Sequence, residues 1–188
     1  MGNTASNVSA GKPKKTGAIF AAPYGTELPT STSDALNDAF KCLGFCSDAG
    51  VVNSTNIETT KIKAWGGETV LVINTSKEDT YKFTLIEVKN SDVLKFVYGA
   101  GNVSGSLETG MTVTANSDQP DPVSLVIDMI MSDNTSKRVV IPSASISAVG
   151  DITYADNSAV GYETTLDCVP DGDGNTHYEY MLKSAGSV

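Results

Sequence analysis

The sequence predicts a mainly β protein, an antiparallel β-barrel or β-sandwich with one flanking α-helix. Three observations support this fold class. Most apolar residues fall in runs of strand length, several runs alternate apolar with polar residues, and Gly, Pro, Asn or Asp bounds them. Only one stretch, residues 90–98, has a well-developed helical spacing. The length of 188 residues fits a single domain, so we expect one hydrophobic core.

The two ends of the chain are expected to lie outside this domain. Residues 1–16 are polar and include Gly, Pro and Ser, so they are predicted to form a flexible N-terminal arm. The β domain is predicted to span residues 17–183, and residues 184–188 to form a C-terminal tail. The first strand is expected over residues 17–22, because Pro23 closes an apolar run there.

A possible short helix is predicted over residues 34–41. Ser33 or Asp34 could cap it, and Leu36 and Phe40 lie four residues apart, on one helical face.

The middle of the chain is predicted to form strands, a tight turn and the flanking helix. Runs 57–64 and 68–74 are separated by Trp65, Gly66 and Gly67, which indicates a hairpin because glycines adopt the backbone angles of tight turns. Residues 81–85 alternate apolar and polar side chains, as in a half-buried strand. In the helix, Ser91 or Asp92 is the expected cap, and Gly99 the expected stop.

The C-terminal half reads as further strands separated by turns. Residues of the run 122–131 alternate cleanly, as do those of 161–168, so one face of each strand is expected to meet the core. A strand left at the edge of such a sheet offers unpaired N–H and C=O groups to another subunit. The remaining strands are predicted at 107–115, 137–141, 145–154 and 176–182.

Charge and cysteine content exclude several classes of protein. The net charge of −9 disfavours a nucleic-acid-binding surface, which needs clustered Lys and Arg. No run has the apolar length of a secretory signal or membrane span, so we expect folding in the cytoplasm. The three cysteines, Cys42, Cys46 and Cys168, lack the spacing of a disulfide framework or zinc site and are expected as free thiols.

The sequence contains few of the residues and motifs that catalysis, metal binding or cofactor binding require. His177 is the only histidine, and we interpret it as a surface residue at the start of a strand. Nucleotide-loop, dinucleotide and zinc-hydrolase motifs are missing, so no cofactor is expected. Residues 171–175, Asp-Gly-Asp-Gly-Asn, begin like a calcium loop, but Thr176 stands where that loop needs glycine and Leu182 where it needs Glu. We therefore predict a hairpin turn and no enzyme.

Several segments together resemble the major tail proteins of siphophages that infect Gram-positive bacteria. The resemblance covers about residues 17–182, and no single motif carries it. It rests on the order and spacing of Gly-Ala-Ile-Phe-Ala-Ala-Pro-Tyr-Gly-Thr-Glu-Leu-Pro-Thr at 17–30, Phe-Lys-Cys-Leu-Gly-Phe-Cys-Ser-Asp-Ala-Gly at 40–50, Lys-Ala-Trp-Gly-Gly at 63–67, Thr-Leu-Ile-Glu-Val-Lys-Asn at 84–90, Val-Leu-Lys-Phe-Val-Tyr-Gly at 93–99, Arg-Val-Val-Ile-Pro at 138–142, Gly-Asp-Ile-Thr-Tyr at 150–154, Ala-Val-Gly-Tyr-Glu at 159–163 and the turn at 170–175.

This resemblance implies a tail tube fold and a structural role in the virion. Copies would form hexameric rings, stacked into a hollow tube that conducts the phage DNA during ejection, and assembly would take place in the bacterial host cytoplasm. The implied partners are further copies of the chain, the tape measure protein, and a tail terminator or distal tail protein. Double-stranded DNA would pass without sequence-specific binding, because an acidic wall repels it.

Two segments are candidates for contacts between rings. They are the basic cluster of the N-terminal arm and the Trp65 turn, since tryptophan is favoured at the centre of interfaces. The candidate residues are Lys12, Lys14, Lys15, Trp65, Gly66 and Gly67. The polar faces of the 57–74 hairpin and of the strand 81–87 are candidates for the channel wall.

An alternative from another class is a secreted β-sandwich adhesin or carbohydrate-binding module. Such proteins also combine short strands, Asn- and Thr-rich loops and an exposed aromatic residue. They normally carry a signal peptide, which this sequence does not show.

Overall fold

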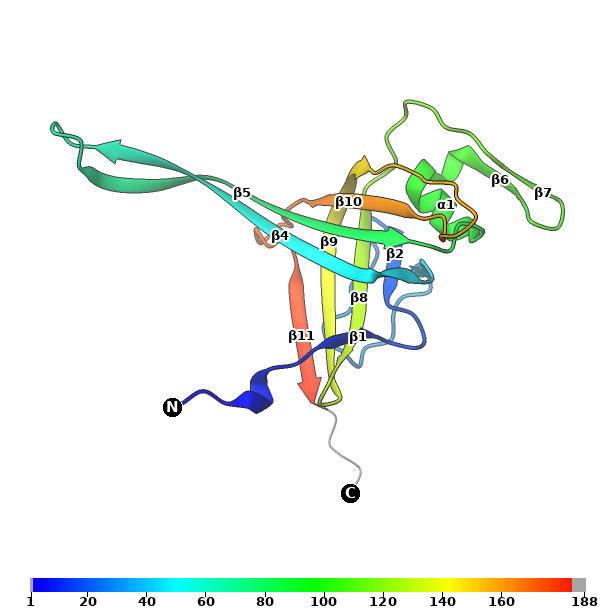
Figure 1. The fold of residues 1–188 in the computed structure, drawn as a ribbon, viewed down its shortest axis with the longest axis horizontal. Coiled ribbons are helices and arrows are strands. Elements are labelled where there is room, and N and C mark those ends of the chain that lie inside the picture. Colours follow the sequence, from blue (N-terminus) through cyan, green and yellow to red (C-terminus); the bar gives the residue numbers. More distant parts are fainter. Residues whose placement is uncertain (1, 184–188) are drawn as a thin grey trace, which may run out of the picture.

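One strongly twisted antiparallel sheet dominates the fold, which we describe for residues 2–183 of a computed structural model (Figure 1). Its strands run in the order β3-β2-β8-β9-β10-β5-β4, with β1 also pairing with β8 and β11 with β9. The elements are η1 (Ala5–Asn7), β1 (Gly11–Pro13), β2 (Ile19–Pro23), β3 (Lys41–Cys42), β4 (Cys46–Lys63), β5 (Thr69–Leu85), α1 (Ser91–Tyr98), η2 (Ala100–Asn102), β6 (Val103–Ser106), β7 (Gly110–Val113), β8 (Val123–Met131), β9 (Thr135–Val149), β10 (Tyr162–Cys168) and β11 (Tyr178–Lys183). The predicted mainly antiparallel β fold with one α-helix is confirmed.

The main core lies between α1 and one face of the sheet, to which β2, β5, β8, β9 and β10 contribute. The helix contributes Val93, Leu94, Phe96 and Val97, and the ring of Phe96 stacks on that of Phe83 in β5, with centroids 6.3 Å apart. The helix begins where predicted, but its cap is Asn90, whose side chain accepts a hydrogen bond from the backbone N–H of Asp92 at 3.0 Å. The helix therefore closes one side of the core.

A second, smaller core lies on the other face of β8 and β9. Val126 and Val140 pack there against Ala22 and Phe40, and the segment that connects β2 to β3 covers them. Because a layer covers each face, β8 is buried on both sides over its middle, including Ser124 and Asp128. The alternating run 122–131 is thus a central strand, whose polar-face residues are also buried.

The predicted helix at 34–41 is wrong, because side chains capture the backbone groups that a helix would use. The Ala39 backbone N–H donates to the Asn37 side chain at 3.0 Å. The Asp34 carboxylate in turn holds the preceding residues, accepting hydrogen bonds from the Thr30 backbone N–H at 2.8 Å and from the Ser31 hydroxyl at 2.6 Å. The Asp34 carbonyl accepts from Arg138 instead of from a following turn. Ser and Asp commonly compete with helix formation in this way. Leu36 and Phe40 still pack on the second core.

Part of the N-terminal segment that was predicted to be flexible, residues 1–16, is attached to the sheet. β1 pairs with β8 over Gly11–Pro13, opposite Met131, Ile130 and Met129. β1 and β2 follow one another along the same edge of β8, with residues 14–18 looping between them. Residues 11–14 are therefore part of the folded body, contrary to the expectation of a free arm. The predicted tail at 184–188 lies outside the described residues.

The turn at Asp171 joins two strands that do not form a hairpin with each other, so the predicted hairpin turn is wrong. β10 pairs with residues 144–149 of β9 and β11 with residues 135–140, end to end on the same edge. The Asp171 carboxylate accepts hydrogen bonds from the backbone N–H groups of Asp173 and Asn175 and from the Tyr178 hydroxyl. Its oxygens are thus used to shape the loop.

Candidate functional site

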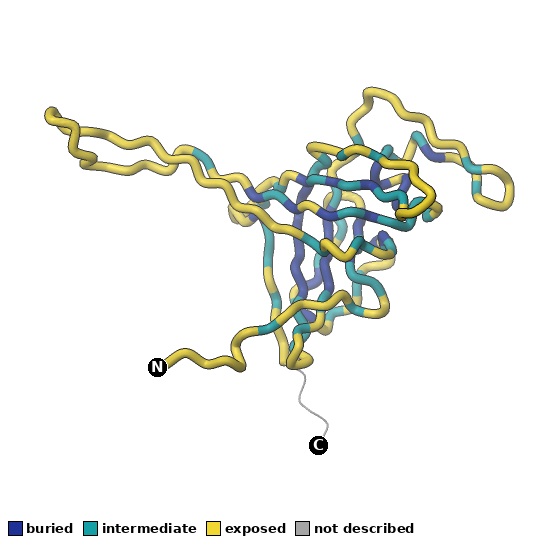
Figure 2. Tube along the Cα trace, viewed as in Figure 1, coloured by how far each residue is buried: buried dark blue, intermediate teal, exposed yellow. Residues whose placement is uncertain are grey.

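The feature that stands apart from the body is a long β-hairpin, which we call the arm and define as residues 52–75. It is the outer part of β4 and β5, and Figures 1 and 2 show it projecting along the long axis of the molecule. Every residue of the arm is exposed. The sequence predicted two strands here, but not that they would leave the body and continue as a free ribbon.

The arm carries many apolar side chains that nothing in the chain covers. Direct pairing places Ile62 opposite Leu71 and Thr60 opposite Ile73, so these four side chains share one face. The neighbouring residue Val72 lies on the other face. An isolated two-stranded ribbon is at best marginally stable in water, and its exposed edges favour pairing with another chain. The exposed apolar residues of the arm are Val52, Ile57, Ile62, Trp65, Val70, Leu71, Val72 and Ile73.

The Trp65 turn closes the arm as predicted. The Ala64 backbone N–H donates to the Glu68 carbonyl at 2.8 Å, and the Gly67 N–H donates to the Ala64 carbonyl at 3.0 Å. Gly66 and Gly67 have φ angles of 123° and 95°, which explains why glycine stands at both positions. Trp65 has a relative exposure of 107 %, so its whole indole ring is in solvent. A large aromatic presented in this way is typical of a contact residue.

A buried carboxylate, Asp79, fixes the root of the arm on the body. It accepts hydrogen bonds from the hydroxyls of Thr55 in β4 and Thr176 before β11, and Lys77 lies 3.1 Å from it. Burial alone raises the pKa of Asp79, but the hydrogen bonds from Thr176 and Thr55 and the charge of Lys77 outweigh it and lower the pKa to about 2. Asp79 is therefore ionised and joins three segments. Its sequence context gave no sign of this role.

The basic cluster of the N-terminal segment lies on the body, away from the arm tip (Figure 1). Lys14 forms an ion pair with the Asp128 carboxylate at 3.1 Å, so its charge already has a partner within the chain. Lys12, in β1, and Lys15 are exposed. The structure thus does not bring Lys12, Lys14 and Lys15 together with Trp65, Gly66 and Gly67 in one copy.

The outer face of β5 and β10 is polar. Thr80, Lys82 and Thr84 of β5 lie directly opposite Asp167, Thr165 and Glu163 of β10, on the face that points away from the main core. Lys82 and Glu163 form an ion pair at 2.8 Å, which is partly exposed. Asp48 and Asp151 lie at the end of this face and line a cavity with Glu163. The result is a polar surface with an excess of carboxylates.

The described residues show no arrangement suited to catalysis. His177 packs edge-on against the ring of Tyr81, with centroids 5.7 Å apart, beside Thr176. Burial raises the pKa of Cys46 and that of Cys168, the latter to about 12, so neither thiol is activated as a nucleophile. Among residues 2–183, no group of three or more His, Cys, Asp or Glu side chains could hold a metal ion.

No helix in the described part of the chain is long and apolar enough to cross a membrane.

Comparison with known proteins shows a match to one protein family. Residues 2–186 match the family model described as phage tail tube protein. No curated protein matches the chain. Two solved structures are similar: the tail of an empty GTA particle refined with C6 symmetry, and the cryo-EM structure of the cap that terminates the tube of the anti-feeding prophage. The first has a TM-score of 0.46 and 11 % identity and covers 93 % of this chain and 99 % of its own. The second has a TM-score of 0.45 and 10 % identity and covers 97 % of this chain and 100 % of its own.

Proposed function

The chain belongs to the phage tail tube protein family, and from this premise we propose how its copies build the tube. Membership makes the protein a structural component of the phage tail, and not an enzyme. We propose that six copies form a ring, and that the rings stack into a hollow tube through which DNA leaves during ejection. The family assignment favours this function over that of a secreted adhesin.

The exposed arm carries this proposal. Its uncovered apolar side chains and unpaired strand edges would be unfavourable in a protein that works as a monomer, because apolar surface exposed to water costs roughly 25 cal/mol per Å². Burial of the arm against a neighbouring copy removes this cost. We propose that the arm and its Trp65 turn, with Gly66 and Gly67, contact the adjacent ring.

The N-terminal segment is proposed as a second contact. Lys12 and Lys15 are exposed and available to another copy, whereas Lys14 holds the segment on the body through Asp128. Self-association through different surfaces of one chain extends an assembly instead of closing it as a dimer.

We propose the outer face of β5 and β10 as the channel wall. Its carboxylates, including Glu163 and Asp167, are consistent with the passage of DNA without adhesion, since like charges repel at close range. The arm, whose polar face was the other candidate, projects beyond the body (Figure 2) and is proposed as contact surface instead.

The proposal also includes the type of phage, the place of assembly and the other tail proteins that contact the tube. We place the protein in a siphophage of Gram-positive bacteria, with assembly in the host cytoplasm. The tape measure protein would lie inside the tube, and a tail terminator or distal tail protein would contact its ends.

Electron microscopy of the concentrated purified protein tests the proposed function. We expect rings or hollow tubes with sixfold averages in end view. A variant with residues 59–74 replaced by two glycines should fold and remain monomeric, because the arm contributes nothing to either core. A wild-type protein that stays monomeric at high concentration and binds glycans would contradict the proposal and favour the adhesin.

A further inference from the structure

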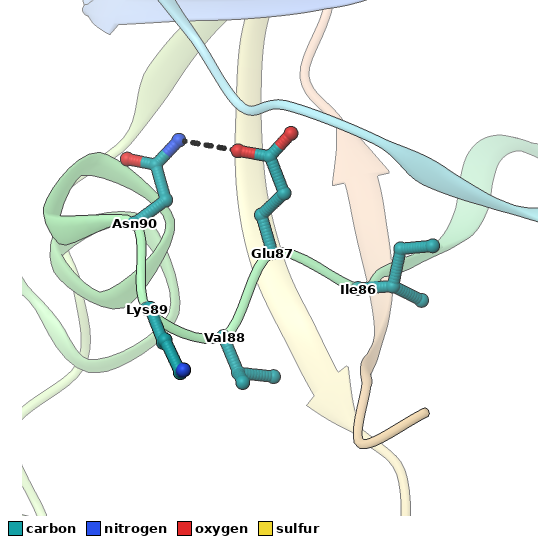
Figure 3. Close-up of a pocket in the computed structure, with 5 residues that line it drawn as sticks. All are labelled: Ile86, Glu87, Val88, Lys89 and Asn90. Atoms are coloured by element: carbon teal, nitrogen blue, oxygen red, sulfur yellow. Dashed lines mark hydrogen bonds between the residues drawn. The ribbon is translucent and has the colours of Figure 1, made fainter. Parts of the chain in front are cut away.

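A groove lies at the end of β5 that is farthest from the arm tip. Residues Ile86, Glu87, Val88, Lys89 and Asn90 line its volume of about 460 Å³ (Figure 3). In Figure 3, Glu87 and Asn90 point to the same side of the segment, and the Asn90 side-chain amide donates to Glu87 at 3.1 Å. This hydrogen bond shapes the segment before α1. The hollow is open to solvent, so a side chain of another chain can reach it.

Phe45 bonds two groove residues through its backbone and has an exposed aromatic side chain. Its backbone N–H donates to Glu87 at 2.9 Å, and its carbonyl accepts from the Ile86 N–H at 3.0 Å. The side chain nevertheless remains 73 % exposed. Since the Phe45 backbone is bonded to Ile86 and Glu87, this exposed side chain is attached directly to the segment that lines the groove. Aromatic side chains pair favourably with one another in such settings.

The arm tip and the cavity that adjoins the groove carry complementary charges. Asp48 and Asp151 line a cavity that adjoins the groove and shares Ile86 with it. On the arm, Lys61 and Lys63 precede the Trp65 turn. Within residues 2–183, none of these four charged groups has an opposite charge within 4.0 Å. Electrostatic complementarity of this kind selects a partner and fixes its register.

The arm tip also carries an acidic residue, and the groove a basic one, so these two charges are complementary as well. Glu68 follows the Trp65 turn, and Lys89 lines the groove. The described chain gives neither of them an ion-pair partner. Both the basic and the acidic side of the tip would therefore meet an opposite charge at the groove.

One copy cannot make this contact with itself. The Trp65 turn precedes β5 and the groove follows it, and β5 has 17 residues, so the two sites are roughly 55 Å apart at about 3.3 Å per residue. Figure 1 shows the turn and the end of β5 on opposite sides of the molecule. A contact between such sites joins copies head to tail along the direction of β4 and β5.

We propose that the Trp65 turn of one copy docks into the groove at residues 86–90 of a second copy, with Trp65 beside Phe45 and Lys61 and Lys63 facing Asp48 and Asp151. This inference rests on the proposed function and specifies the surface that receives the arm. In the proposed tube this contact would connect consecutive rings, as proposed above for the arm.

Disulfide trapping with the variant pair Ala64→Cys and Lys89→Cys tests the contact and leaves Trp65 in place. The control pair is Ala64→Cys with Leu107→Cys, because Leu107 is also exposed, at 59 %, but lies in the β6–β7 turn. After mild oxidation of assembled protein, we expect a ladder of covalent oligomers on a non-reducing gel for the first pair only. The wild-type protein measures the background from Cys42, Cys46 and Cys168.

The possible results separate this contact from the proposed function. Tubes without a ladder for the first pair, or with an equal ladder for the control, would overturn the contact and leave the tube subunit intact. Wild-type protein that forms no tubes would instead overturn the proposed function. If the double variant itself does not assemble, the two single variants are mixed and oxidised: a covalent heterodimer supports the contact, and its absence overturns it.

Discussion

Arg138 donates two hydrogen bonds to the buried carboxylate of Asp128, from Nε at 2.7 Å and from Nη2 at 2.9 Å. Both residues are 4 % exposed. The remaining Nη1 donates to the carbonyls of Ser31 and Asp34, at 2.9 and 2.8 Å. One ion pair thus connects β8 and β9 to the segment that covers the second core, and through Lys14 also to the N-terminal segment.

Replacement of Arg138 by Leu should strongly destabilise the fold. The change leaves the Asp128 carboxylate buried with Lys14 as its remaining charged partner, and loss of one member of a buried pair costs about 3–5 kcal/mol. Arg138→Lys should be intermediate, because lysine keeps the charge but not the paired geometry. Urea denaturation at pH 7 measures both variants. An unchanged midpoint for Arg138→Leu would show that the pair is not important for stability.

Asp79 should make the stability depend on pH in the acid range. Its folded-state pKa of about 2 lies below the ordinary value of 3.8, so its contribution is present above pH 4 and is lost as the pH falls towards 2. At about 1.4 kcal/mol per pKa unit, the contribution is roughly 2 kcal/mol. We expect Asp79→Asn to be less stable than wild type by this amount at pH 7, and the difference to disappear near pH 2. Urea denaturation at pH 7, 4 and 2.5 measures this difference, and a constant value would contradict the assignment.

Two N-terminal truncations should separate the free part of the segment from the attached part. Removal of residues 1–8 should leave the unfolding free energy nearly unchanged, because β1 and Lys14 remain. Removal of residues 1–16 should lower it by about 1–3 kcal/mol, because the strand pairing and the Lys14 ion pair are lost. Thermal denaturation followed by circular dichroism distinguishes the two. Equal melting temperatures would indicate that β1 adds nothing to the body.

Lys12→Ala with Lys15→Ala tests the proposed ring contact of this segment without disturbing its attachment. Both side chains are exposed, so the melting temperature should stay the same while tubes become shorter or fail to form. Electron microscopy measures tube length. Tubes of normal length would remove these lysines from the contact.

The apolar face of the arm should be needed for assembly and not for folding. Ile62→Ser with Leu71→Ser removes two directly opposed, exposed side chains, so the unfolding free energy should change by less than about 1 kcal/mol. Tube formation should be lost. Val169→Ser is the matched control, because Val169 is 48 % exposed but lies after β10 on the body. If both variants assemble normally, the arm face is not an interface.

Local features of the sequence predicted much of the fold correctly. The glycines after Trp65 marked the turn, the spacing of Val93, Leu94 and Val97 marked the helix, and alternation marked most strands. The absence of clustered catalytic residue types and the order of several segments indicated a structural protein of the tail tube family, which the family model confirms. These features are short-range properties of residue type and spacing, so they can be read directly from the chain.

The tertiary structure decided which strands pair and which faces are covered. Alternation across residues 57–74 is the same whether a third strand lies beside them or only water does, so the sequence could not reveal a projecting arm. The helical spacing of Leu36 and Phe40 was overruled because the side chains of Asn37 and Arg138 bond backbone groups that a helix would use. Asp79, Asp128 and Arg138 read as ordinary charged residues, and their roles arise from partners that lie 10 or more positions away in the chain or in other strands. The sequence by itself determined the local elements and the class of protein, whereas long-range packing determined the surfaces through which we propose that it assembles.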